Sequence, residues 1–128
     1  MESITVSVHH GILFILDPAN AGVLIPEYVD DQPVASTASC LSVVVQPSVD
    51  GDVEVSLGFR EAAPTGLFRI ALGHIAVPHG TVAVDTADEG VLLKRTVPAG
   101  RATVSIWVDE LRGSTRMFVN IEGALGSV

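Results

Sequence analysis

Apolar and polar residues alternate along most of the chain, which is the pattern of β-strands with one buried face. The alternation occurs in segments 4–8, 41–45, 53–59, 68–77, 81–85, 101–109 and 117–121, and Ile12–Leu16 is a continuous apolar run that predicts a further strand. A further run, Val91–Leu93, is apolar on both faces and predicts a central strand covered on both sides. Because no segment has helical periodicity, the sequence predicts an all-β protein. Its expected form is a single antiparallel β-sandwich of about nine strands over residues 1–128, with a jelly roll or partly open barrel as the alternative.

Turn residues predict which strands are neighbours. His9-His10-Gly11 is expected to close a hairpin between the strands on either side of it, and Asp50-Gly51 is a strong hairpin signal between alternating runs. Val23–Ile25 predicts a short strand that ends at Pro26, and Gly73-His74 predicts a bulge within a longer strand.

One phrase occurs twice in the second half of the chain, as Val77-Pro78-His79-Gly80 and as Val97-Pro98-Ala99-Gly100. Each copy has Pro at the second place of a tight turn and Gly at the fourth, and each precedes a strand that ends in an acidic turn. A C-terminal meander of up-and-down strands would place the two acidic turns side by side and both phrases at the opposite end. The carboxylates expected to gather at the acidic end are Asp85, Asp88, Glu89, Asp109 and Glu110.

The negative charge of the chain comes from its first half. The net charge is −8, and residues 1–59 contain eight acids without any Lys or Arg, whereas residues 60–128 contain seven acids and seven bases. Such a surface repels nucleic acid and anionic lipid, and it attracts a basic protein or a cation. Solubility alone is the alternative explanation.

A loop between two prolines offers a second candidate contact surface. Glu27-Tyr28-Val29-Asp30-Asp31 lies between Pro26 and Pro33 and combines an aromatic side chain with acids. Tyrosine is enriched at interface hot spots, although Tyr28 could instead fold back onto the core. The residues predicted to bind a partner are therefore Glu27, Tyr28, Asp30, Asp31, Asp85, Asp88, Glu89, Asp109 and Glu110.

The main alternative function is a calcium-dependent β-sandwich binding module, in which the acidic turns would hold the ion. Asp50-x-Asp52, Asp85-x-x-Asp88-Glu89 and Asp109-Glu110 contain the oxygen ligands that Ca²⁺ prefers, but no complete calcium loop is present. Residues that are neighbours on a strand point to opposite faces, so His9 and His10 are not expected to share a metal unless the turn reorients them. The spacing of His74 and His79 matches no zinc motif. We therefore expect no metal or other cofactor.

No catalytic motif is present. The sequence has no G-x-S-x-G elbow and no phosphate-binding glycine loop, and Cys40, the single cysteine, has no recognisable histidine partner. A protein that is not an enzyme is expected. The single cysteine favours a reducing, cytoplasmic location, and the apolar run 12–16 is too short for a signal peptide or a membrane span. A further alternative is a non-catalytic subunit of a homo-oligomer, for example a homodimer, without a small-molecule role.

Residues 68–110 contain phrases with a recognisable cadence: Phe68-Arg69-Ile70-Ala71-Leu72, then Ile75-Ala76-Val77-Pro78 with Gly80, then Thr96-Val97-Pro98-Ala99-Gly100 before the strand that includes Val104-Ser105-Ile106. This order of strand and turn segments resembles that of the bacterial competence protein J family, whose members are small β-rich nuclease inhibitors. The resemblance implies an inhibitor or immunity-like protein that blocks a basic nuclease or toxin by steric and electrostatic occlusion. It implies no catalytic residues.

Overall fold

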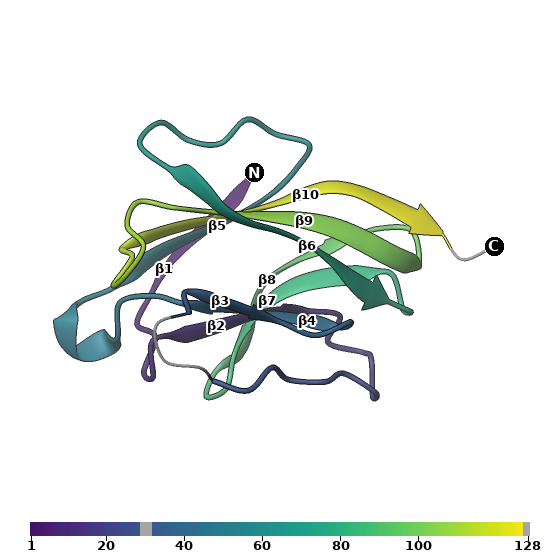
Figure 1. The fold of residues 1–128 in the computed structure, drawn as a ribbon, viewed down its shortest axis with the longest axis horizontal. Helices are drawn as coiled ribbons and strands as arrows, with labels where there is room; N and C mark the ends of the chain where they lie inside the picture. Colours follow the sequence, from purple (N-terminus) through teal and green to yellow (C-terminus); the bar gives the residue numbers. More distant parts are fainter. Residues whose placement is uncertain (29–31, 127–128) are drawn as a thin grey trace.

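The protein is an all-β sandwich, as the alternation predicts (Figure 1). The computed structural model describes residues 1–28 and 32–126, and no helix in these ranges has the length and apolar character needed to cross a membrane. Its elements are β1 (Glu2–Val6), β2 (Ile12–Leu16), β3 (Val34–Ser36), β4 (Cys40–Val44), a 3₁₀ turn η1 (Ser48–Asp50), β5 (Val53–Phe59), β6 (Phe68–Val77), β7 (Thr81–Thr86), β8 (Gly90–Thr96), β9 (Gly100–Val108) and β10 (Arg116–Gly126).

Two five-stranded sheets pack face to face. Sheet A has the strand order β1-β5-β10-β9-β6, and sheet B has the order β3-β4-β2-β7-β8. All pairings are antiparallel except that of β10 with β5, which is parallel and places Met117 opposite Val55. The last strand of the chain therefore lies in the middle of sheet A.

The core between the sheets consists of the inward-facing residue of each strand. Alternate positions on β5 and β9 are fully buried, as the sequence pattern predicts for strands with one apolar face. The buried apolar residues on the central strands include Leu13, Ile15, Leu41, Val43, Val53, Val55, Leu57, Val82, Val84, Val104, Ile106, Val108, Val119 and Ile121.

Both hairpins predicted in the first half of the chain are wrong. β1 pairs with β5 in sheet A and β2 pairs with β4 and β7 in sheet B, so His9-His10-Gly11 carries the chain from one sheet to the other. The segment with Asp50-Gly51 likewise connects β4 in sheet B to β5 in sheet A through η1. A turn signal predicts that the chain reverses, but it does not predict whether the next strand pairs with the previous one or packs across from it.

The apolar run Val91–Leu93 lies on an edge strand and not in the centre of a sheet. β8 is the last strand of sheet B, and the Val91 side chain is 42% exposed. Leu93 alone of the three belongs to the core, at 9% exposure. Leu92 is partly buried against the core and Val91 is exposed at the sheet edge, so no second layer covers this strand on both faces.

Three smaller expectations also differ from the structure. Val23–Ile25 is a loop, in which Leu24 donates its N–H to Ser39 Oγ (2.8 Å) and accepts a hydrogen bond from Thr37 Oγ1 on its carbonyl (2.6 Å). The register shift in β6 falls between Arg69 and Ala71, whereas Gly73-His74 pairs regularly with β9. The short edge strand β3 was not predicted from the sequence.

The two copies of the proline phrase meet at one end of the sandwich, as expected. The Gly80 N–H donates to the Val77 carbonyl (3.0 Å) to close the first turn, and the Val97 N–H donates to the Gly80 carbonyl (2.8 Å). The four strands of the predicted C-terminal meander do not lie in one sheet, because β7 and β8 form a hairpin in sheet B whereas β9 and β10 pair in sheet A. The chain therefore changes sheets at the second phrase.

Candidate functional site

Four loops form the end of the sandwich opposite the proline phrases (Figure 1). Residues 45–52 lie in the middle, because the N–H groups of Val45 and Ser48 donate to the carbonyls of Gly11 (2.8 Å) and Val8 (2.9 Å), and the Gln46 N–H donates to the Ser114 carbonyl (2.9 Å). His10 Nε2 lies 3.9 Å from Asp88 Oδ2, so the β7–β8 turn lies next to the 8–11 turn at this end of the sandwich. We call these loops, residues 8–11, 45–52, 86–90 and 109–115, the acidic rim.

The acidic rim contains two aspartates from the first half of the chain and four acids from the second. They are Asp50, Asp52, Asp88, Glu89, Asp109 and Glu110. The two acidic turns of the second half share this end, but the expectation that they lie side by side is wrong. The 8–11 turn and the 45–52 segment lie between them, because β8 and β9 belong to different sheets. Asp85 is not a rim residue, since it lies within β7, where it pairs with Phe14 of β2.

Asp109 shapes its own loop. Its carboxylate accepts hydrogen bonds from the N–H groups of Thr115 (3.0 Å) and Arg116 (3.1 Å) and from the Thr115 hydroxyl. Partial burial by itself raises the pKa of Asp109, but these hydrogen bonds outweigh it and lower the pKa below its ordinary value. The charge of Asp109 is thus used to close the loop that presents Glu110.

The β7–β8 turn presents Asp88 and Glu89 at the rim. Thr86 Oγ1 accepts a hydrogen bond from the Glu89 N–H (2.9 Å), which fixes the turn, and Asp88 faces His10. His9 lies against His10 with ring centroids 4.4 Å apart. Within the described residues, His9, His10 and Asp88 are the one group of three or more side chains whose potential metal-ligand atoms lie within 4.8 Å of one another.

The histidine geometry corrects the sequence-based expectation that neighbouring histidines point apart. His9 and His10 occupy a turn and not a strand, so the alternation of strand side chains does not apply to them. The signal in the sequence was Gly11, which marks the turn. The acids proposed as a calcium site, such as Asp50 and Asp52, form no such group in the described parts of the chain.

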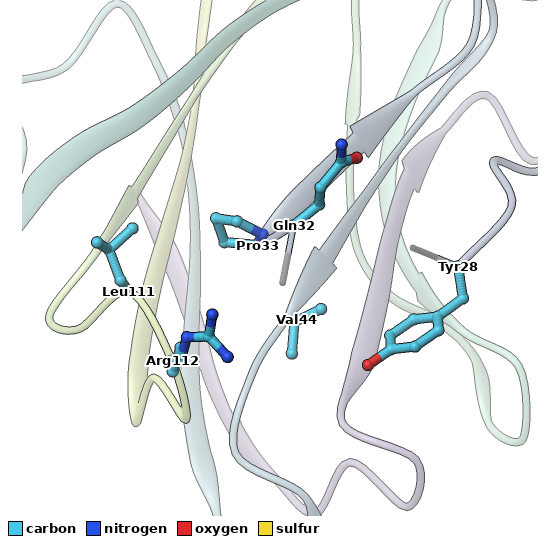
Figure 2. Close-up of a pocket in the computed structure, with 6 residues that line it drawn as sticks. All are labelled: Tyr28, Gln32, Pro33, Val44, Leu111 and Arg112. Carbon is cyan, nitrogen blue, oxygen red and sulfur yellow. The ribbon is translucent and has the colours of Figure 1, made fainter. Parts of the chain in front are cut away.

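Tyr28 lies at the side of the rim, above the outer face of sheet B. Its side chain is 64% exposed, so the alternative that it folds back onto the core is wrong. Tyr28, Gln32, Pro33, Val44, Leu111 and Arg112 line a depression of about 150 Å³. Figure 2 shows Tyr28 and Arg112 on either side of Val44, so the depression connects the Tyr28 loop to the 109–115 loop. Glu27 is exposed, and Asp30 and Asp31 lie outside the described residues.

Cys40 and Asp85 lie close together on the outer side of sheet B. Burial, together with the smaller effect of the negative charge of Asp85, raises the pKa of the Cys40 thiol to about 12. Burial also raises the pKa of Asp85. Because the thiolate is the reactive form of cysteine, Cys40 lacks the properties of a nucleophile.

Not every acid of the first half contributes to surface charge. Asp17 is fully buried, and its carboxylate accepts hydrogen bonds from the N–H groups of Ala19 (3.0 Å) and His79 (2.8 Å). Glu54 lies 3.8 Å from the guanidinium of Arg116. The negative charge is therefore distributed less evenly than the sequence indicates, and six of the acids lie in the loops of the acidic rim.

Comparison with known proteins reveals a likeness in fold. No protein-family model matches the chain, and no curated protein matches it in sequence. Its structure is similar to the crystal structure of ComJ, an inhibitor of the DNA-degrading activity of NucA, from Bacillus subtilis. The likeness covers 97% of this chain and 96% of that one, with a TM-score of 0.72 and 8% sequence identity. The resemblance to competence protein J, which the sequence indicated over residues 68–110, is thus confirmed at the level of the fold over nearly the whole chain.

Proposed function

We propose that the chain is a protein-binding module that inhibits a basic nuclease by covering its phosphate-binding groove. The observation that carries this proposal is the fold, which matches an inhibitor of a DNA-degrading enzyme over 97% of the chain. The net charge of −8 supports it, because a nuclease must present positive charge to bind the phosphate backbone.

The mechanism proposed is the substitution of carboxylates for phosphates. The acids of the rim, which spans one end of the sandwich, can approach the Lys and Arg side chains of the nuclease groove as the phosphates of a nucleic acid do. The body of the sandwich then excludes the nucleic-acid substrate from the groove. Complementary charge raises the association rate and favours basic partners, and its effect falls with ionic strength. A salt-dependent association rate is therefore the expected signature.

The proposed contact residues form two groups. Asp88, Glu89 and Glu110 extend from the acidic rim, and Asp109 supports them by closing its loop. Tyr28 would supply the apolar anchor, and Glu27, Asp30 and Asp31, its near neighbours in the sequence, would add negative charge. Asp85 has a smaller role in this proposal, because it lies within β7 and its environment disfavours the charged form.

The test is inhibition of DNA degradation by nucleases encoded beside this gene, measured at low and moderate salt. Charge reversal at the rim, by Asp88→Lys or Glu110→Lys, should weaken inhibition at low salt by about tenfold or more, because rim charges act mainly on the association rate. Glu2→Lys is the matched control, since it makes the same change in charge at the exposed start of β1, away from the rim. Inhibition that is indifferent to salt, or equally reduced by Glu2→Lys, would contradict the proposed surface.

A further inference from the structure

We propose that His9, His10 and Asp88 form a binding site for a divalent transition-metal ion, for which Zn²⁺ is the appropriate probe. Their potential ligand atoms all lie within 4.8 Å of one another. The proposal concerns the isolated chain and does not depend on the proposed nuclease partner.

The backbone of the 8–11 turn brings the two imidazoles to the same side. The turn is closed by a hydrogen bond from the Gly11 N–H to the Val8 carbonyl (3.1 Å). In such a turn, successive side chains are rotated by an angle nearer to the 100° of a helix than to the 180° of a strand. Hydrogen bonds from Val45 and Ser48 hold both ends of the turn, so the positions of His9 and His10 are fixed by the fold.

Strand register brings the carboxylate to the histidines. β2 and β7 are antiparallel neighbours, with Phe14 opposite Asp85. The residues just before β2 therefore lie beside the residues just after β7, and this register places Asp88 next to His10, with 3.9 Å between Oδ2 and Nε2. The third ligand thus comes from a segment far away in the sequence, which is why no motif spacing reveals the site.

The distances fit a tetrahedral ion after small side-chain movements. Zinc binds His nitrogen and carboxylate oxygen at about 2.0–2.2 Å, so two tetrahedral ligand atoms lie about 3.3 Å apart. The His10–Asp88 separation of 3.9 Å is close to this value, and the upper limit of 4.8 Å exceeds it by about 1.5 Å. All three side chains are exposed, so rotation about their χ angles can close these gaps without movement of the backbone.

The surroundings of the cluster provide a partly apolar recess. A depression of about 250 Å³ contains the three residues together with Val8, Ile12 and Phe14. Glu89 lines the same depression, so the fourth coordination position is open to its carboxylate or to water.

The ligand set selects the class of metal. Two imidazoles and one carboxylate suit Zn²⁺, Cu²⁺ or Ni²⁺, whereas Ca²⁺ and Mg²⁺ take sets made only of oxygen ligands. Calcium at millimolar concentration should therefore leave the melting temperature unchanged, and this comparison separates the proposal from the acidic-loop calcium site.

The experiment is calorimetric titration of the untagged protein with Zn²⁺, with thermal melts in parallel. A free Zn²⁺ concentration of 100 times the Kd should raise the melting temperature by about 10 °C, because the metal binds the folded chain only. His9→Ala, His10→Ala and Asp88→Asn should each weaken binding by about tenfold or more. His79→Ala is the matched control, since its ordered contact with Asp17 uses the backbone N–H and survives the substitution.

A second readout keeps the test independent of the stability of the variants. In the unmodified protein, Zn²⁺ should shift the ring C–H resonances of His9 and His10 and leave those of His74 and His79 in place. The proposal would be overturned if the protein did not bind Zn²⁺, or if the three site variants bound Zn²⁺ as tightly as the unmodified protein. It would also be overturned if His79→Ala weakened Zn²⁺ binding as much as the site variants do. Because every measurement is made without a partner, failure here leaves the nuclease proposal standing, and the reverse also holds.

Discussion

Substitution of Gly11 by alanine tests whether the 8–11 turn holds the acidic rim together. Gly11 has a φ of +67°, and a Cβ at this position would lie 2.8 Å from the Val45 carbonyl oxygen and 3.4 Å from Pro47. The left-handed conformation costs an L-residue about 1–2 kcal/mol, and the displacement of a packed backbone adds about 1–3 kcal/mol. We expect Gly11→Ala to lower the free energy of unfolding by about 2–5 kcal/mol.

Gly90→Ala is the matched control. Gly90 lies in the β7–β8 turn of the same rim with a φ of +75°, and a Cβ there would meet nothing within 4 Å. The two variants share the conformational cost and the change in the unfolded chain, so their difference of about 1–3 kcal/mol isolates the close approach to Val45.

Denaturant unfolding followed by circular dichroism gives both free energies, and thermal melts give about 4 °C per kcal/mol for a chain of this length. Hydrogen exchange adds a local readout, because the amides of Val45 and Ser48 donate to the 8–11 turn and should lose protection in Gly11→Ala alone. Equal destabilisation by the two variants, or unchanged protection of both amides, would refute the idea that this turn is a packed junction.

Three further predictions concern titrating groups. Cys40 should resist thiol reagents at pH 8 until the protein is unfolded, because a pKa of about 12 against an ordinary 9.0 lowers the thiolate fraction about a thousandfold. Asp85→Asn should raise the free energy of unfolding at pH 7, since a raised pKa in the folded state means that ionised Asp85 destabilises it; this gain should vanish as the pH falls to about 3.8. Asp109→Ala should lower the free energy of unfolding by about 1–2 kcal/mol at pH 7 through lost hydrogen bonds to Thr115 and Arg116; because the pKa of Asp109 is lowered, that loss should shrink below pH 3.8. Denaturant unfolding across pH checks the last two, and a loss or gain independent of pH would contradict them.

The sequence predicts the strands well because one buried face imposes a period of two. The core residues Val53, Val55 and Leu57 on β5, and Ala102, Val104, Ile106 and Val108 on β9, follow that period, although Ser56 and Ser105 on the opposite face are buried as well. Partners are harder to predict, since a turn such as Asp50-Gly51 has the same composition whether the chain stays in one sheet or crosses to the other. β8 shows a related ambiguity, because an apolar run such as Val91–Leu93 occurs on a sheet edge as well as in a central strand.

The acidic rim could be predicted only in outline. Local sequence identifies Asp88 and Glu110 as turn residues. It does not show that the chain changes sheets between β8 and β9, which places the two turns in different sheets. The cluster of His9, His10 and Asp88 depends on the pairing of β2 with β7, which no local pattern encodes. Asp109 was predicted as a contact residue, and the structure gives it a role in closing its loop.

The position of β10 between β5 and β9 determines when the molecule can assemble. While the chain emerges from the ribosome, β1 and β5 can pair, and β9 can pair with β6, but these two ribbons remain unconnected until the strand that bridges them has left the exit tunnel. A sheet built in this way is completed late in synthesis, so products of translation that end before β10 would not fold.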